Sequence, residues 1–172
     1  SLSVSGANSY SWNTSSTSNS IVVSPSTSVV YTVNGTSNSG CIGTGTGQVI
    51  VNSLPTISVN SSTICAGQSA TLQVSGASTY SWNTASTNTS IIISPSSSTN
   101  YSVTGTSSNG CLKTLTTQVL VNPLPVLSVS SGSICWGNSY TIQASGAASY
   151  SWNSGQTTPT IVVSPTTTTV YS

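Results

Sequence analysis

A period of 70 residues runs through the whole chain and limits the folds open to it more than any other feature. Residues 5–13 return in closely similar form as residues 75–83 and again as residues 145–153. No insertion or deletion interrupts the period, although surface loops usually accept changes of length at little cost. If every junction is alike, one fixed rotation and translation relates each repeat to the next, as in a rod or a helical array.

Within one period, short segments alternate between polar and apolar residues and are rich in β-branched and aromatic side chains. In residues 70–74, for example, Leu72 and Val74 are predicted to face inward. The predicted strands are residues 56–59, 70–74, 79–83, 90–94, 99–106 and 115–121. We expect a turn over residues 61–68 and a hairpin turn at Asn109-Gly110, because Asn-Gly accepts positive φ. Short strands at this spacing predict an all-β fold of tandem immunoglobulin-like sandwiches, with about six or seven strands per repeat.

The 172 residues span one whole period and parts of two others. We expect residues 53–122 to form a complete repeat that begins at a Leu-Pro linker. Residues 1–52 are then a partial repeat without its first strand, and residues 123–172 a partial repeat without its last strands. We expect the chain to be a section of a longer polypeptide.

Only one residue is charged, Lys113, and the chain has no Asp, Glu or His. General acid–base catalysis depends most often on those three residue types, and calcium sites depend on carboxylate oxygens. The cysteines do not follow a close-spaced zinc pattern, and one lysine cannot neutralise a nucleic-acid backbone. We therefore expect no enzyme activity, no metal or other cofactor, and no nucleic-acid partner.

One tryptophan recurs at the same place in every period, as Trp12, Trp82 and Trp152. Such a row could offer aromatic platforms to sugars, but this position in a β-sandwich usually holds a core tryptophan, which is the reading we favour. A tyrosine at the start of the penultimate strand is predicted to be structural in the same way. These tyrosines are Tyr31, Tyr101 and Tyr171.

Trp136 breaks the period, because it stands where the preceding repeat has Ala66. The turn that carries it lies near a predicted junction. Two interpretations are open: Trp136 fills a contact between repeats or between filaments, or it is a surface aromatic residue without a partner.

The four cysteines, Cys41, Cys65, Cys111 and Cys135, recur as one pair per period and indicate an oxidising compartment. One prediction is a bond between Cys65 and Cys111 inside the repeat. In a sandwich of immunoglobulin topology, however, a strand separates these two turns by roughly 20 Å, which is beyond disulfide reach. The other prediction is therefore that each cysteine bonds to a neighbouring repeat. Both remain open at this point.

Several motifs together resemble immunoglobulin-like and polycystic-kidney-disease-like repeats, most of all those of giant Bacteroidetes-type surface adhesins, including gliding-motility adhesins. The motifs are ICAGQS at 64–69, YSWN at 80–83, Ser94-Pro95, NYSV at 100–103 and NGC at 109–111. The resemblance implies secretion, an extracellular position at the cell surface, and a role as stalk or adhesive filament. Related repeats often carry Asp near the tryptophan, and this chain has none.

We therefore expect a structural repeat region of a secreted adhesin or extracellular filament, which supplies reach, stiffness and protease resistance. Its expected partners are neighbouring repeats of the same chain, laterally associated copies, and surface glycans. Two alternatives remain open: a glycan-binding module that uses exposed aromatic and threonine rows, and a passive spacer in a secreted polysaccharide-degrading enzyme.

Overall fold

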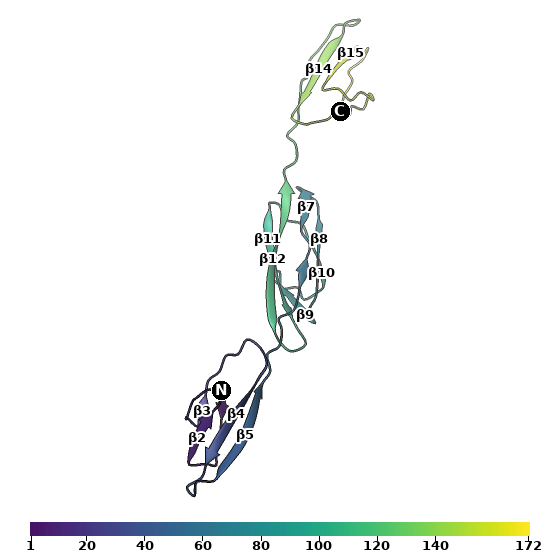
Figure 1. Ribbon diagram of the computed structural model, residues 1–172. Helices are drawn as coiled ribbons and strands as arrows, with labels where there is room; N and C mark the ends of the chain where they lie inside the picture. The colour runs from purple at the N-terminus through teal and green to yellow at the C-terminus, as the bar shows by residue number, and fades with distance from the viewer. The chain divides into compact units, whose positions relative to one another are not determined.

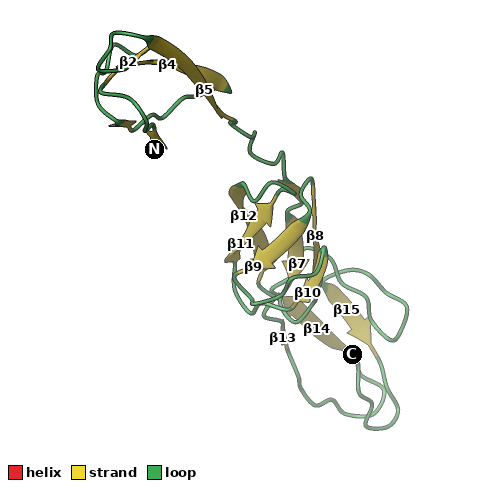
Figure 2. Ribbon diagram, turned by 90° about the horizontal axis from the view of Figure 1, so that it is seen from below, coloured by secondary structure: helices red, strands yellow, loops and turns green.

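The computed structural model describes all residues, 1–172, and consists of strands and loops without any helix (Figures 1 and 2). No segment therefore forms an apolar helix of the length needed to cross a bilayer. The chain divides into two compact units, one of residues 1–60, 72–91 and 100–117 and the other of residues 61–71, 92–99 and 118–172.

Residues 1–52 contain five strands in two sheets. The strands are β1 (Leu2–Ser3), β2 (Ser9–Trp12), β3 (Ser20–Ile21), β4 (Val29–Thr36) and β5 (Ile42–Val49). β1 pairs with β3, and the second sheet has the antiparallel order β2-β4-β5. The buried core consists of Trp12, Ile21, Tyr31 and Val33. The alternation of β4, in which Tyr31 and Val33 are buried and Val30 and Asn34 exposed, accounts for this core.

Residues 53–122 contain seven strands. They are β6 (Ser58–Val59), β7 (Ser62–Cys65), β8 (Ala70–Ser75), β9 (Thr79–Trp82), β10 (Ser90–Ile93), β11 (Thr99–Thr106) and β12 (Leu112–Asn122). One sheet has the order β10-β8-β6, and the other has the order β7-β12-β11-β9. Every second residue of β8 is buried, with Leu72 fully inaccessible, as the alternation of the sequence predicts.

One strand of this segment was not expected. β7 lies inside residues 61–68, for which the sequence predicts a turn, and only the part after Cys65 is a turn. β7 pairs in parallel with the end of β12, from Ser62 opposite Val119 to Cys65 opposite Asn122. A four-residue strand in which only two residues are apolar depends on a partner far along the chain, so the local pattern does not reveal it.

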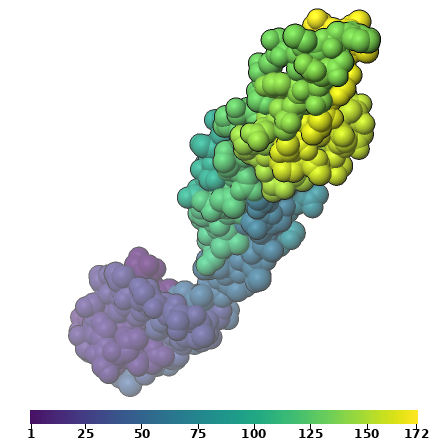
Figure 3. Space-filling view, turned by 90° about the horizontal axis from the view of Figure 1, so that it is seen from above, coloured from purple at the N-terminus to yellow at the C-terminus, as the bar shows by residue number.

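Residues 123–172 contain one three-stranded sheet in the order β13-β14-β15, formed by β13 (Ser128–Val129), β14 (Tyr140–Ser145) and β15 (Thr160–Val163). The green residues of β14 and the yellow residues towards the C-terminus lie beside each other in Figure 3. The buried core is Ile142, Trp152, Ile161 and Val163, with Tyr140 and Tyr171 packed against it.

Candidate functional site

No site of catalytic or metal-binding type stands out among the side chains. No group of three or more His, Cys, Asp or Glu lies together as metal ligands would. Thr117 is the one buried polar residue, and its Oγ1 donates a hydrogen bond to the Asn60 carbonyl oxygen at 2.8 Å. Every buried side-chain nitrogen or oxygen atom has a hydrogen-bond partner.

The recurring tryptophans lie in the cores of their segments. Trp12, Trp82 and Trp152 are 5%, 3% and 6% exposed. Each indole Nε1–H donates to the main-chain carbonyl oxygen six residues later, at 2.8, 2.9 and 2.9 Å. The indole rings are thus held by the main chain and present no open face on which a sugar ring could stack.

The recurring tyrosines are also inside or against the cores. Tyr31 and Tyr101 are each 8% exposed, and Tyr171 is half-buried. A second tyrosine, not singled out from the sequence, ties the Ser-Gly-Ala turn to the strand after it. The Tyr80 hydroxyl accepts from the Ala77 amide at 2.8 Å and donates to the Ala77 carbonyl at 3.0 Å, and Tyr10 does the same with Ala7.

Trp136 is the exception, because 85% of it is exposed. It occupies a tight turn that the Asn138 amide closes on the Cys135 carbonyl at 3.1 Å, with Gly137 at a φ of 86°. The equivalent turn around Ala66 closes in the same way, from the Gln68 amide to the Cys65 carbonyl. The backbone therefore accepts either residue, and only the surroundings of the side chain differ.

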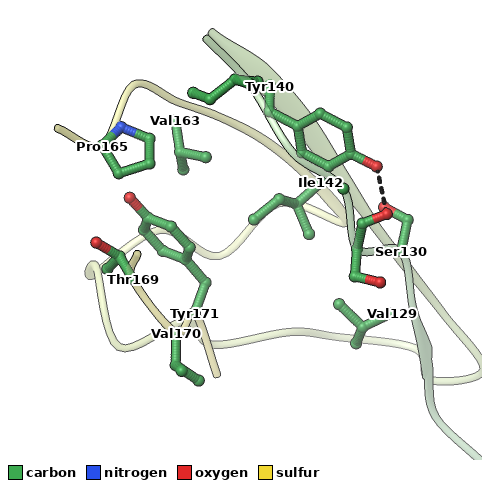
Figure 4. Close-up of a pocket in the computed structure, with 12 residues that line it drawn as sticks. Val129, Ser130, Tyr140, Ile142, Val163, Pro165, Thr169, Val170 and Tyr171 are labelled. Carbon is green, nitrogen blue, oxygen red and sulfur yellow. Dashed lines mark hydrogen bonds between the residues drawn. The ribbon is translucent and has the colours of Figure 1, made fainter. Parts of the chain in front are cut away.

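A groove lies beside Trp136 in residues 123–172, formed by two cavities of about 380 and 550 Å³ that share Gly132, Ile134, Pro165 and Thr169 in their lining. Ile142, Val163 and Tyr171 also line the cavity of about 380 Å³ (Figure 4). The Tyr140 hydroxyl, at its side, donates to the Ser131 carbonyl oxygen at 2.8 Å.

The repeat period explains this groove. In residues 53–122 the corresponding walls, Ser62–Cys65 and Ser98, hold the end of β12. Val119 is fully buried there, and the Val121 amide donates to Ser98 Oγ at 3.0 Å. One period later the walls are residues 132–135 and Thr168, and residues 123–172 include no counterpart of β12. The apolar lining of the groove thus corresponds to the surface that the end of β12 covers in residues 53–122.

All four cysteines are free thiols; Cys41, Cys65 and Cys135 are exposed and Cys111 is half-buried. The predicted bond between Cys65 and Cys111 does not occur. Cys65 is paired with Asn122 at one end of β12, whereas Cys111 directly precedes Leu112 at the other end. A strand from Leu112 to Asn122 separates two such positions by about 35 Å, far beyond disulfide reach. Bonds to neighbouring repeats remain a prediction.

The linkers contain contacts that the sequence did not reveal. The Cys111 thiol donates to the Asn52 carbonyl oxygen at 3.7 Å, so this cysteine lies where the linker enters its repeat. Gly76 lies so close to the Thr56 carbonyl that a side chain at residue 76 would collide with it. Gly146 meets the Val126 carbonyl in the same way, one period later. The constant period through the linkers was the only sequence signal of these contacts.

Comparison with known proteins gives eight matching chains among the solved structures, two of which are described here, and no sequence family. No family model and no curated protein matches the chain. One structure, described as "Structural insight into host cell surface retention of a 1.5-MDa bacterial ice-binding adhesin", is 18% identical, with a TM-score of 0.30 over 80% of this chain and 60% of that chain. The other, "Ca2+-stabilized adhesin helps an Antarctic bacterium reach out and bind ice", is 13% identical, with a TM-score of 0.29 over 80% of this chain and 46% of that chain. At these TM-scores neither similarity supports an inference about function.

Proposed function

We propose that this chain is a structural repeat region of a secreted cell-surface adhesin or extracellular filament. Its role is mechanical rather than catalytic: it supplies reach, stiffness and resistance to proteolysis, and laterally associated copies are its partners. The repeats are proposed to be immunoglobulin-like sandwiches, of which residues 53–122 are one complete copy.

The burial of Trp12, Trp82 and Trp152 carries this proposal. Aromatic residues that recur at a fixed period serve either a repeated binding surface or a repeated core. Less than a tenth of each indole is exposed, and each indole nitrogen is bonded to the main chain. The recurring element therefore favours a repeated scaffold over a row of ligand platforms.

Strand order supports the immunoglobulin-like interpretation. The sheets β10-β8-β6 and β7-β12-β11-β9 divide the strands of residues 53–122 as an immunoglobulin-type domain does, with consecutive strands distributed between two sheets. The tryptophan lies on β9, the third long strand of the segment after β7 and β8.

Reach and stiffness are supported by the way that the linkers are seated. Residues 53–56 line one shallow cavity together with Gly76, Ala77 and Ser107, so this linker lies against the turns of the repeat that it enters. The collision that a side chain would cause at Gly76 or at Gly146 shows the same close approach in two successive repeats.

Digestion with proteinase K tests the proposed durability. This protease cleaves after aliphatic and aromatic residues, which the chain has in abundance, so resistance has to come from folding and not from the lack of lysine and arginine. We expect residues 53–122 to survive as a fragment after digestion that degrades an unstructured control. Loss of this segment at the rate of the control would overturn the proposal.

A glycan-binding role is the second candidate, and the exposure of Trp136 is the observation that favours it. A neutral-glycan array distinguishes the two roles. The structural role predicts no binding above background for the chain or for Trp136→Ala. Binding that Trp136→Ala abolishes would favour the glycan-binding role.

A further inference from the structure

We propose that a disulfide joins each repeat to the next. One partner is the cysteine at the end of β7, which is Cys65 in residues 53–122. The other partner is the cysteine of the Asn-Gly-Cys turn in the following repeat, at the position equivalent to Cys111. The inference rests on the proposed structural role, since a covalent staple at each junction serves an array that transmits force. It assigns a partner class to thiols that are free in the structure.

The first half of the site is Cys65 at the end of its repeat. It lies directly across the β7–β12 pair from Asn122, the last residue of β12. Neighbouring strands are about 4.8 Å apart, so the Cys65 backbone lies within that distance of Asn122. The burial pattern of β7 alternates, and Cys65 is on its exposed side.

The second half of the site is Cys111 at the start of its repeat. Its thiol contacts the carbonyl oxygen of Asn52 at 3.7 Å. Asn52 is the residue one period before Asn122, and each is followed two residues later by Leu-Pro. Asn52 and Asn122 are thus equivalent residues at two successive junctions. Cys111 contacts the first, and Cys65 is paired with the second.

When the contact of Cys111 with Asn52 is shifted by one period, the equivalent cysteine of the following repeat lies at Asn122, beside Cys65. Asn122 would then have Cys65 across the strand pair on one side and the Asn-Gly-Cys cysteine of the following repeat at its carbonyl oxygen. A disulfide requires a Cα separation of about 4.4–6.8 Å, and the proposal places both cysteines beside this one residue.

The equality of successive junctions supports this shift by one period. Gly76 receives the Thr56 carbonyl and Gly146 receives the Val126 carbonyl, so each linker enters its repeat by the same close contact. Since the approach of Thr56 to residue 76 fixes where the linker lies, the repeated contact predicts that Asn122 meets the next repeat as Asn52 meets Cys111.

The chemistry needs an oxidant, which we name as an oxidised low-molecular-weight thiol such as oxidised glutathione. Both S–H bonds break and one Sγ–Sγ bond forms. The two protons and two electrons pass to oxidised glutathione, whose own disulfide breaks and yields two reduced molecules. An extracellular or periplasmic location provides such conditions.

The test extends the full chain by a second copy of residues 103–122 after Ser172, which stands one period after Ser102. The extension supplies an Asn-Gly-Cys cysteine to the repeat that follows Cys65. After oxidation at micromolar protein concentration, we expect one intramolecular disulfide, between Cys65 and the appended cysteine, seen by mass spectrometry of chymotryptic peptides without reduction. The unextended chain is expected to form no intramolecular disulfide.

Cys65→Ser in the extended chain is expected to abolish the bond, whereas the matched variant Cys41→Ser leaves it intact. A bond between Cys65 and Cys111, a bond between Cys135 and the appended cysteine, or no intramolecular bond would overturn the inference. If the bond fails to form while residues 53–122 still resist proteinase K, only the staple is refuted and the structural role stands.

Discussion

At the scale of single residues, the equivalent positions of the three repeats act as natural substitutions. Ser15 and Ala85 have positive φ values of 66° and 64°, in the turn that the buried tryptophan begins. One period later the same position is Gly155, with a φ of 83°. All three repeats thus keep the left-handed conformation at this position, but only one has glycine, the residue that adopts it without strain.

Ala85→Gly is therefore expected to stabilise residues 53–122. A left-handed conformation costs a residue with a Cβ atom about 1–2 kcal/mol, and the greater freedom of glycine in the unfolded chain offsets part of the gain. We expect the free energy of unfolding to rise by about 0.5 kcal/mol, measured by urea denaturation with tryptophan fluorescence. The reciprocal variant Gly155→Ala should lower it, and equal effects of the two variants would contradict the argument.

Gly76→Ala is expected to be among the most damaging small substitutions in the chain. The new methyl group would collide with the Thr56 backbone, which cannot move as a side-chain end could. We expect a loss of about 2–3 kcal/mol, read from faster hydrogen exchange in residues 53–122 by mass spectrometry.

Gly6→Ala provides the matched control for this variant. Gly6 has nearly the same φ, 98° against 94°, but nothing lies within 4 Å of the position that a Cβ would take. Its substitution should cost only the conformational strain, about 1 kcal/mol. An equal loss from both variants would show that the positive φ alone, and not the close contact with the Thr56 backbone, explains the need for glycine at residue 76.

At the scale of strands, the alternation of polar and apolar residues predicted the positions of the strands that have one buried face. β11 spans the expected residues 99–106, and β8 and β9 agree with expectation within a residue, because their burial repeats every second position. β7 was missed because it depends on pairing with the distant end of β12, and β12 begins three residues earlier than expected. Local sequence reports the face of a strand and not its neighbour.

β12 offers a test of its register. Val119 is fully buried, and Leu120 beside it is 45% exposed. Val119→Ala should lower the free energy of unfolding by about 2 kcal/mol, because it removes buried methyl groups and leaves a cavity. Leu120→Ala should cost less than about 1 kcal/mol, although it removes more atoms. Urea denaturation distinguishes the two, and a larger loss from Leu120→Ala would contradict the register.

At the scale of the whole molecule, the sequence predicted the all-β class of the chain better than the contacts at its linkers. Composition alone leads to the expectation of no catalysis and no calcium binding, because the chain has no Asp, Glu or His. The junction chemistry was not foreseen in detail, because the contacts of Cys111 with Asn52 and of Gly76 with Thr56 join residues whose proximity no local pattern encodes. The constant period indicated only that the length of the linkers is constrained, and not which contacts constrain it.

The near absence of charge leads to the last prediction, that stability hardly depends on pH between 4 and 7. Stability changes with pH only where the folded and unfolded chains bind different numbers of protons. With no Asp, Glu or His, no side chain exchanges protons in this range, so that difference is close to zero. The thermal unfolding midpoint should move by less than about 2 °C from pH 4 to pH 7, and equally little with added salt.

Thr117→Asp is the matched control, because Thr117 is buried and of similar size. Burial should raise the pKa of the new carboxyl group above its value in the unfolded chain. Its protonated form then favours the folded state below the unfolded pKa, and this stability is lost as pH rises through the folded pKa. The variant should therefore melt at a lower temperature at pH 7 than at pH 4, whereas the unmodified chain should not. A pH-dependent midpoint in the unmodified chain would contradict the prediction.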